Sequence, residues 1–289
     1  MPDSPGRRLR DAVVESTIQV PGAPMALFGR LIERMGFQAT YLSGAAFSAG
    51  TLGLPDIGFF TLTELAESLR HLTRSVQIPV IVDADTGFGE SVHLERTIQE
   101  LERAGAAAIQ IEDQVWPKRC GHLSGKSVVE AAVMESRIRI AASAKTDDDL
   151  VILARTDARG THTLEEAIDR AKRYIDAGAD WIFVEALTSK KEFEQVADAI
   201  DAPLVANMTE FGKGPLLTHE ELANMGYAAV LYPVTLLRVA MKAAETSLAL
   251  IATEGSQESL LDLMQTREEL YDLLDYSDFE QRDRSHFGN

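Results

Sequence analysis

The sequence predicts an α/β fold, a (β/α)8 barrel of the TIM type, and three observations support this prediction. Eight short apolar runs alternate with segments of helical periodicity along the 289 residues. Glycines typical of helix ends, such as Gly105 and Gly178, precede several of the runs. The runs are nearly continuous, which indicates parallel strands buried on both faces. A doubly wound open sheet is the alternative, but it usually has fewer strands and a glycine-rich fingerprint after the first one, and neither is seen here.

The expected strands and helices follow one another in regular order. Residues 91–105 and 163–178 each place apolar residues at three- and four-residue spacing, as amphipathic helices do. The second segment begins with Thr163 and Glu166, which match the pattern of a capping box. The eight strands are expected within residues 17–23, 34–45, 78–87, 103–114, 149–159, 176–187, 202–212 and 224–235.

The chain is expected to form one domain over residues 1–289. Its length and its 45% hydrophobic content are sufficient for one large core. Residues 254–289 continue past the eighth strand–helix unit as a helical C-terminal extension, in which residues 256–276 predict one or two helices. No linker rich in Pro, Gly or Ser separates this extension from the barrel.

Composition and charge exclude several classes of function. The formal net charge of −17 argues against nucleic-acid binding, which requires a basic face, and it disfavours anionic membrane surfaces. No apolar run reaches the roughly 18 residues of a membrane span, and the N-terminal residues lack the apolar region of a secretory signal. A single cysteine forms no intramolecular disulfide, so we expect a cytoplasmic protein.

Polar side chains follow the apolar runs at the points where the strands are expected to end. In a barrel of this type these points meet at one mouth, where reactive residues lie. We therefore expect these side chains to converge on one site: Ser43, Asp83, Asp85, Glu112, Asp113, Arg155, Asp157, Glu185, Asn207 and Thr209.

Two of these carboxylates indicate a metal site. Asp83 and Asp85 are two residues apart, and on a strand this spacing points both side chains to the same side. Carboxylates at a wet mouth suit Mg²⁺, which keeps several water ligands, and Glu112 and Glu185 add further oxygens. Helix capping or a turn is the alternative, because Asp is common in both.

Three further strand-end residues indicate an anionic substrate. Arg155 follows an apolar run, and its planar fork can bind two oxygens of a carboxylate or phosphate. The alternative is a buried salt bridge with Asp157 or a neighbouring glutamate. Asn207 and Thr209 can donate hydrogen bonds to a carboxylate, or they can serve only in a turn.

The single cysteine, Cys120, lies in a loop with unusual neighbours. Lys118, Arg119 and His122 would each stabilise a thiolate and lower the pKa of the thiol. Residues 116–126 follow the fourth expected strand and contain glycines, so they are expected to form a mobile lid over the mouth. A lone cysteine can also be a small buried hydrophobic residue.

Motifs in the chain resemble those of a known superfamily. They are "YLSGAA", "LGLPDIG", "VDADTGFG", "IEDQ", "KRCGH", "ARTDA", "NMTEFG", "LYPVT" and "MQTREELYD", in one order from residue 41 to 272. The chain is similar in these motifs to the isocitrate lyase / phosphoenolpyruvate mutase superfamily. The resemblance implies a barrel whose eighth helix is swapped with a neighbour, in a homotetramer built as a dimer of dimers. It also implies Mg²⁺, with Mn²⁺ as a substitute, and cleavage of a tricarboxylate, 2-methylisocitrate, to pyruvate and succinate in propionate catabolism.

The resemblance also implies roles for individual residues. Cys120 would protonate the carbanion left by bond cleavage, His122 would lie beside it, and Tyr41, Lys118 or a hydroxide on the metal would act as the base. The implied metal residues are Asp83, Asp85 and Glu112. The implied substrate-binding residues are Ser43, Gly44, Ala45, Gly121, Arg155, Glu185, Asn207, Met208, Thr209, Arg238 and Arg267. Ala45 departs from the pattern, since some relatives have glycine there.

Other activities within the superfamily compete with this prediction. Isocitrate lyase, oxaloacetate hydrolase and lyases of 2-alkylmalates share the cysteine loop, and a catalytically silent homologue is a further alternative. Phe183 and Leu231 lie on strands at positions that should face the mouth, where isocitrate lyases carry bulkier aromatic residues. Smaller side chains would leave room for the extra methyl group, which is worth roughly 1–3 kcal/mol in such a pocket.

Overall fold

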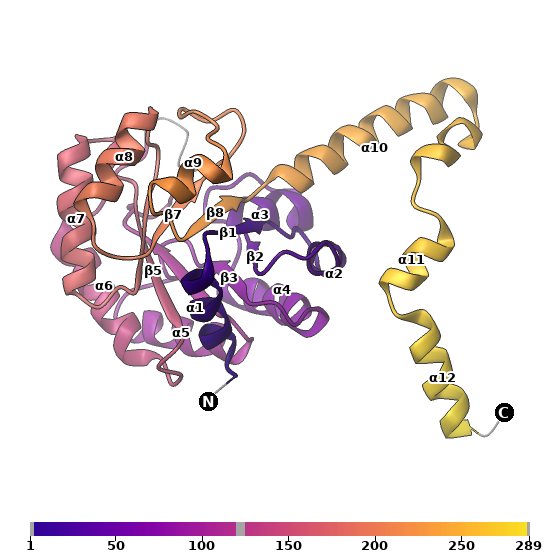
Figure 1. Cartoon of the computed structure of the whole chain (residues 1–289), viewed down its shortest axis with the longest axis horizontal. Coiled ribbons are helices and arrows are strands. Elements are labelled where there is room, and N and C mark those ends of the chain that lie inside the picture. Colours follow the sequence, from indigo (N-terminus) through magenta and orange to yellow (C-terminus); the bar gives the residue numbers. More distant parts are fainter. Residues whose placement is uncertain (1–2, 120–124, 288–289) are drawn as a thin grey trace. The chain divides into compact units, whose positions relative to one another are not determined.

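The computed structural model describes residues 3–119 and 125–287, and its centre is one parallel sheet curled into a barrel (Figure 1). The described residues form eight strands, and each run that the sequence predicted contains one of them. The strands are β1 (Ile18–Pro21), β2 (Thr40–Leu42), β3 (Val80–Asp83), β4 (Ala108–Glu112), β5 (Val151–Thr156), β6 (Trp181–Val184), β7 (Leu204–Asn207) and β8 (Ala229–Tyr232). The predicted (β/α)8 barrel is confirmed.

One helix precedes the first strand, and the helices that follow it connect the strands and cover the outside of the barrel. They are α1 (Pro5–Glu15), α2 (Ala26–Arg34), α3 (Gly44–Leu52), α4 (Leu62–Ser75), α5 (Val92–Arg103), α6 (Ala131–Ala144), α7 (Leu164–Asp176), α8 (Lys190–Ala199) and α9 (His219–Asn224). After β8 come α10 (Thr235–Glu254), a 3-10 turn (Glu258–Leu263), α11 (Arg267–Leu273) and α12 (Tyr276–Phe287).

The barrel is closed more weakly at one seam than elsewhere. The strand order is β1-β8-β7-β6-β5-β4-β3-β2, so every neighbouring pair except β1 and β2 forms a parallel ladder. A single parallel bridge, Gly22 with Tyr41, joins β1 to β2 just past the end of β1. The hydroxyl of Thr40 adds one hydrogen bond to the carbonyl of Pro21 at 2.9 Å.

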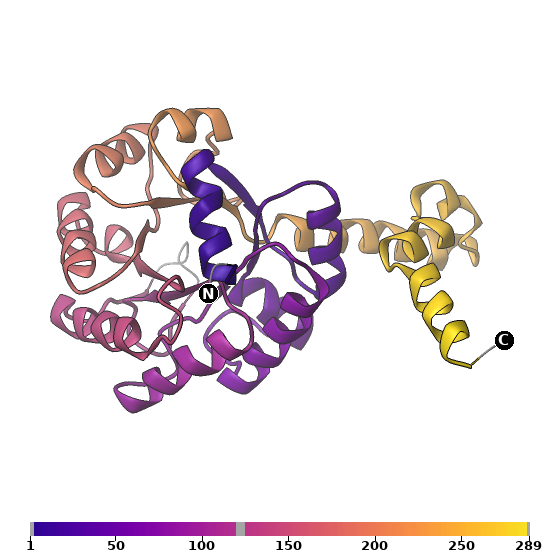
Figure 2. The same cartoon turned by 60° about the horizontal axis from the view of Figure 1, so that its bottom comes forward.

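The two faces of the sheet form two separate apolar clusters. Outward side chains such as Ile109 and Ile152 pack against the helices in the larger cluster. Inward side chains such as Ile81 and Phe183 fill the barrel, and Leu9 of α1 joins them from the amino end. Figure 2 shows α1 lying across the ring of strands. Burial on both faces explains why the strand sequences are continuously apolar.

Helix starts show where the local sequence signals hold. Complete capping boxes begin α4, α9 and α11. The box predicted at Thr163 and Glu166 is only half formed. Thr163 accepts from the backbone N–H of Glu166, but the Glu166 carboxylate accepts from Arg170 at 2.9 Å. A cation one turn further along the helix has therefore taken the place of the N-cap backbone as its partner.

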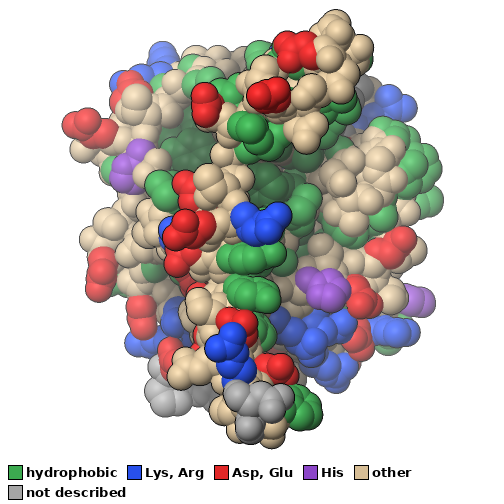
Figure 3. Space-filling view, turned by 90° about the vertical axis from the view of Figure 1, so that its right-hand side faces the viewer, with side chains coloured by type: hydrophobic (Ala, Val, Ile, Leu, Met, Phe, Trp, Pro, Cys, Tyr) green, Lys and Arg blue, Asp and Glu red, His purple; other side chains and the backbone are tan. Residues whose placement is uncertain are grey.

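The chain divides into two compact units, residues 1–236 and 237–289. The second unit holds nearly all of α10, whereas the sequence placed the start of the extension at residue 254. Helix α10 has no buried residue, and Val239, Met241 and Leu248 are each at least 60% exposed. Apolar side chains also reach the surface on the face drawn in Figure 3, where they stand among acidic and basic groups. No helix in the described residues is long and apolar enough to cross a membrane.

Candidate active site

A layer of polar side chains lies inside the barrel at the carboxyl ends of neighbouring strands. Asp83 ends β3, Glu112 ends β4, Arg155 lies one residue before the end of β5, and Asn207 ends β7. The sheet register pairs Glu112 with Arg155 directly. Glu185 follows β6 and is buried, as are Asp83, Glu112 and Arg155, whereas Asn207 is half-buried. Inward positions alternate along each strand, so the chain places these residues above the apolar filling of the barrel.

Asp83 and Asp85 converge, but not for the reason that the sequence suggested. Strand β3 ends at Asp83, and Asp85 has a φ of 48°, so the two residues do not share a strand. Asp83 accepts hydrogen bonds from the backbone N–H groups of Asp85 and Gly44, both at 3.2 Å. A Cβ at position 44 would lie 3.0–3.2 Å from both carboxylates, so glycine at this position lets α3 approach them closely.

Glu112 is the least satisfied group in this layer. Both of its carboxylate oxygens are buried and accept no hydrogen bond from the described residues. The nearest cation is Arg155, whose Nε lies 3.4 Å from Oε2. Burial raises the pKa of Glu112 well above its usual range, although Arg155 and Lys118 oppose this. A cation bound in the mouth would favour the ionised carboxylate of Glu112 and offset the cost of burying it.

Arg155 holds the centre of the charge network. Its Nε and Nη2 donate to Asp157 at 2.9 and 3.2 Å, and Nη2 lies 3.5 Å from Glu185. The guanidinium lies 5.2 Å from the centre of the Phe183 ring, which packs beneath it in the barrel. The described contacts are therefore those of the buried salt bridge, the alternative that the sequence left open. The carboxylate clamp stays a prediction.

Lys118 enters the same layer from the loop after β4. Its Nζ contacts Asp56 and lies 2.8 Å from Oδ1 of Asp85, and the side chain is 3% exposed. Burial alone would lower the pKa of Lys118, but Asp85, Glu112 and Asp56 outweigh it and hold that pKa well above the usual value. Burial raises the pKa of Asp85 to about 7. In this arrangement Lys118 is a cation rather than a base.

Tyr41, the other candidate base, lies below the polar layer. It is buried inside the barrel, and its hydroxyl donates to Oε1 of Gln110 at 3.0 Å. Gln110 in turn donates to Oδ1 of Asp83 at 3.0 Å. Burial, followed by the charge of Asp83, raises the pKa of Tyr41 well above its usual value. This geometry suits a residue that fixes Asp83 through Gln110.

A second carboxylate cluster supports the polar layer from behind. Asp113 accepts from Thr156 at 2.7 Å and from Tyr174 at 2.8 Å, and its other oxygen accepts from the backbone N–H of Asp157 at 2.8 Å. Asp157 also accepts from Lys126 at 2.5 Å. The roles of Lys126 and Gln110 were not predicted from the sequence. Gln110 was detectable, because it lies two residues before Glu112 on the inward side of the same strand.

The strand-end residues on the far side of the mouth are only partly satisfied. Asn207 donates from Nδ2 to Glu185 at 3.1 Å, while its Oδ1 is buried without a partner among the described residues. Glu185 also accepts from the backbone N–H of Ala186. Met208 is buried, and its sulfur accepts from the backbone N–H of Leu217, so it lines the loop rather than the mouth. Thr209 is half-buried in that loop.

The remaining predicted residues fall into three groups. Ser43 caps α3 by accepting from the backbone N–H of Ala46, and Gly44 and Ala45 form the first turn of that helix. Arg238 and Arg267 belong to the second unit. Cys120, Gly121 and His122 lie outside the described residues.

The donor set in the mouth fits a hard divalent cation. Glu112 presents two buried oxygens that accept no hydrogen bond within the described ranges, and the carboxylates of Asp83 and Asp85 face the same helix start. No three acidic, histidine or cysteine side chains within residues 3–119 and 125–287 form a complete ligand set. Mg²⁺ needs no such set, because it is usually held by one or two carboxylates and keeps several waters.

The fold and this site define an enzyme of the TIM-barrel class with an acidic mouth that carries buried cations. Residues 17–252 match the family described as phosphoenolpyruvate phosphomutase. The chain belongs to this family, within the phosphoenolpyruvate mutase / isocitrate lyase superfamily that the sequence motifs indicated.

Relatives and solved structures extend over nearly the whole chain. The chain is 52% identical to "2-methylisocitrate lyase" of Aeropyrum pernix, over 97% of this chain and 91% of the relative. It is 44% identical to "2-methylisocitrate lyase" of Escherichia coli, over 96% and 95%. A crystal structure of 2,3-dimethylmalate lyase superposes with a TM-score of 0.92 at 34% identity, over 98% of this chain and 95% of that one. A structure of oxaloacetate acetylhydrolase with 3,3-difluorooxalacetate gives 0.94 at 31% identity, over 99% and 98%.

Proposed function

We propose that this enzyme cleaves 2-methylisocitrate to pyruvate and succinate with the help of Mg²⁺, in the catabolism of propionate. The observation that carries the proposal is the mouth itself. Among the described residues the Glu112 carboxylate accepts no hydrogen bond, and the buried cations Arg155 and Lys118 pair with Glu112 and Asp85 respectively. The relatives named as 2-methylisocitrate lyases, at 44–53% identity, support the choice of substrate.

In this proposal Asp83, Asp85 and Glu112 hold the cation. When bound, Mg²⁺ draws electron density from the substrate's hydroxyl and its adjacent carboxylate. Gln110 and the backbone of Gly44 hold Asp83 in place, which fixes the direction from which its oxygens act. Mn²⁺ has similar ligand preferences and should substitute.

The chain's own groups then control charge and protons. The hydroxyl proton passes to a base in the mouth, the bond between the hydroxyl-bearing carbon and its neighbour breaks, the first fragment becomes the ketone of pyruvate, and the electron pair passes to the succinate fragment. Arg155 and Asn207 stabilise the charge that grows there. Lys118, held as a cation by Asp85 and Asp56, offsets the negative charge of the bound carboxylates. The thiol of Cys120 supplies the proton that completes succinate.

The remaining parts of the proposal concern assembly and location. Helix α10 presents exposed apolar side chains, as a helix that packs on a second copy of the chain would. We therefore propose a homotetramer built as a dimer of dimers, with this helix exchanged between neighbours, in the cytoplasm. Light scattering coupled to size-exclusion chromatography should give four times the chain mass of 31.6 kDa, and a monomer mass would contradict the assembly.

A substrate panel tests the reaction. Purified full-length enzyme with Mg²⁺ is assayed on 2-methylisocitrate, isocitrate, oxaloacetate and 2,3-dimethylmalate, with chromatographic identification of the products. We expect the highest kcat/KM with 2-methylisocitrate and release of pyruvate. Equal kcat/KM for isocitrate, or turnover only of oxaloacetate or 2,3-dimethylmalate, would assign the site to another activity of the superfamily.

A further inference from the structure

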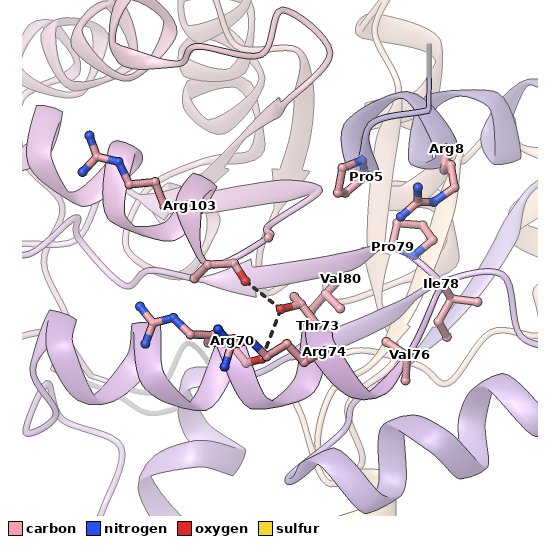
Figure 4. A pocket seen from close by; sticks show the side chains of 12 residues that line it. Pro5, Arg8, Arg70, Thr73, Arg74, Val76, Ile78, Pro79, Val80 and Arg103 are labelled. Atoms are coloured by element: carbon pink, nitrogen blue, oxygen red, sulfur yellow. Dashed lines mark hydrogen bonds between the residues drawn. The ribbon is translucent and has the colours of Figure 1, made fainter. Parts of the chain in front are cut away.

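A pocket lies at the amino end of β3, the end opposite to the one that carries Asp83. It has a volume of about 250 Å³ and is bounded by the start of α1, the last turns of α4 and the turn between α5 and β4. Figure 4 shows the pocket with Arg8 of α1 on one side and Arg103 of α5 on the other. All of its walls belong to the first compact unit.

The lining of this pocket is strongly cationic. Four of its twelve lining residues are arginines, namely Arg8, Arg70, Arg74 and Arg103, and none of the twelve is acidic. The whole chain carries a net charge of −17, so a local excess of positive charge is not a consequence of composition. Arg8 and Arg103 have carboxylate partners outside the lining, Asp3 and Glu100, at 3.4 and 3.2 Å. Arg70 and Arg74 have none among the described residues.

Two of these arginines, Arg70 and Arg74, have no carboxylate partner among the described residues. Arg70 and Arg74 are one turn apart on α4, where like charges repel and cost a few tenths of a kcal/mol. Neither guanidinium forms a hydrogen bond or ion pair with any residue in the described part of the chain. Without an anion between them, the two like charges repel each other, and no contact among the described residues offsets this repulsion.

The helix dipole accounts for some of the arginines but not for all. Arg74 and Arg103 lie in the last turns of α4 and α5, where a cation is favourable. Arg8 lies near the start of α1, where a cation is unfavourable, and the first turn of α1 contains no acidic residue. Arg8 contacts Asp3 through Nη1, yet its Nε is buried without an acceptor among the described residues.

The walls of the pocket are held in place. The hydroxyl of Thr73, between the two arginines of α4, donates to the carbonyl of Ala104 at 2.6 Å. Gly105 follows with a φ of 94°, and a Cβ there would lie 3.1 Å from Thr73. The end of α4 and the turn after α5 are thus fixed against each other, so the pocket is largely formed before any ligand enters.

We propose that this pocket binds a compact anion with at least two negative charges, either a phosphate ester or a small polycarboxylate. Guanidinium groups match both chemistries, because their N–H pairs bind two oxygens at once. The anion would join α1 to α4 and α5 and remove the repulsion between Arg70 and Arg74. It acts away from the mouth, and the proposal does not depend on which substrate the mouth cleaves.

Titration calorimetry on the full-length, metal-free protein tests the site. Pyrophosphate and citrate serve as separate probes in buffer treated with a chelating resin. The double variant Arg70→Gln and Arg74→Gln removes two pocket cations, and Gln keeps a high helix propensity. The double variant Arg96→Gln and Arg139→Gln, at exposed positions outside the pocket, makes the same change in net charge.

We expect at least one probe to bind, with affinity reduced at least about tenfold in the pocket variant and little changed in the control variant. Binding of pyrophosphate alone assigns a phosphate ligand, and binding of citrate alone assigns a polycarboxylate. Absence of binding by both probes at millimolar concentration would overturn the proposal. So would binding that the pocket variant retains in full, or an equal loss in both variants. Lyase assays without either probe should give the same kcat for the pocket variant and the wild type, whatever the preferred substrate is.

Discussion

The two ends of the barrel carry charge in opposite ways. At the carboxyl ends of the strands, Arg155 and Lys118 are buried among carboxylates, and Glu112 still has no hydrogen-bond partner among the described residues. At the amino end, Arg70 and Arg74 reach solvent with no carboxylate in the pocket lining. Buried charges are costly and require paired groups or a ligand, whereas exposed like charges are screened and tolerated. The buried charges at the carboxyl end therefore need a ligand more than the solvent-accessible arginines at the amino end do.

The largest effect should come from removing the sulfur of Cys120, which lies outside the described residues. Cys120→Ser should lower kcat by about 10²-fold or more, because a positioned proton donor typically contributes that much. Mg²⁺ affinity and the midpoint of thermal unfolding should stay unchanged, and both serve as controls. Near-normal turnover would mean that the Cys120 side chain contributes only to packing and donates no proton.

The charge at the mouth can be tested apart from turnover. Glu112→Gln should weaken Mg²⁺ binding at least about tenfold, as measured by calorimetry, because it removes the negative charge and replaces one of the two buried oxygens proposed to hold the ion with an NH2 group. Glu165→Gln removes an exposed carboxylate on α7 and should leave the affinity unchanged. If the two variants bind Mg²⁺ equally well, the ion does not sit at Glu112.

The support behind the mouth should contribute less. Tyr174→Phe removes a hydrogen bond to the buried carboxylate of Asp113 and should cost about 2 kcal/mol of unfolding free energy. Tyr227→Phe is the matched control, since its hydroxyl is also buried but donates to a neutral carbonyl, that of Phe193. It should cost about 1 kcal/mol. Equal costs in urea denaturation would contradict a charged support network.

The smallest effect is expected at an exposed charge. The ion pair with Lys190 and the capping hydrogen bonds from Thr218 lower the pKa of Glu221 to about 2. A carboxyl whose pKa is lowered by folding stabilises the fold above its unfolded pKa and loses this contribution as the pH falls toward the folded value. Wild type should therefore be slightly more stable than Glu221→Gln at pH 7, and this difference in stability should decline between about pH 4.5 and pH 2. Glu220→Gln, in the same helical turn but outside the box, should show no such decline in denaturation midpoints.

Much of the mouth was predictable, because strand periodicity alone places Asp83, Glu112, Arg155 and Asn207 at strand ends. Their partners were less accessible. The contact of Lys118 with Asp56 and that of Lys126 with Asp157 join positions far apart in the chain. Nothing in the local sequence indicates these pairs.

Two other features also needed the folded chain. Arg155 is paired with Asp157, two residues further along the chain, and with carboxylates from β4 and from the segment after β6. The sequence named Asp157 as a possible partner, but it could not show whether Arg155 turns toward these carboxylates or toward a substrate. The arginine pocket went unnoticed because its four cations come from three helices, and each of them resembles an ordinary surface residue in its own segment.

The seam between β1 and β2 gives the ring of strands one weak joint. Ladders elsewhere hold each strand to both neighbours, whereas here a single bridge and a threonine hydroxyl complete the circle. Local fluctuations that expose backbone amides to deuterium exchange should therefore begin at this joint. Tyr41 forms part of it and reaches Asp83 through Gln110. Opening of this joint is thereby linked, through two hydrogen bonds, to the carboxylate oxygens of Asp83 that are proposed to bind the ion.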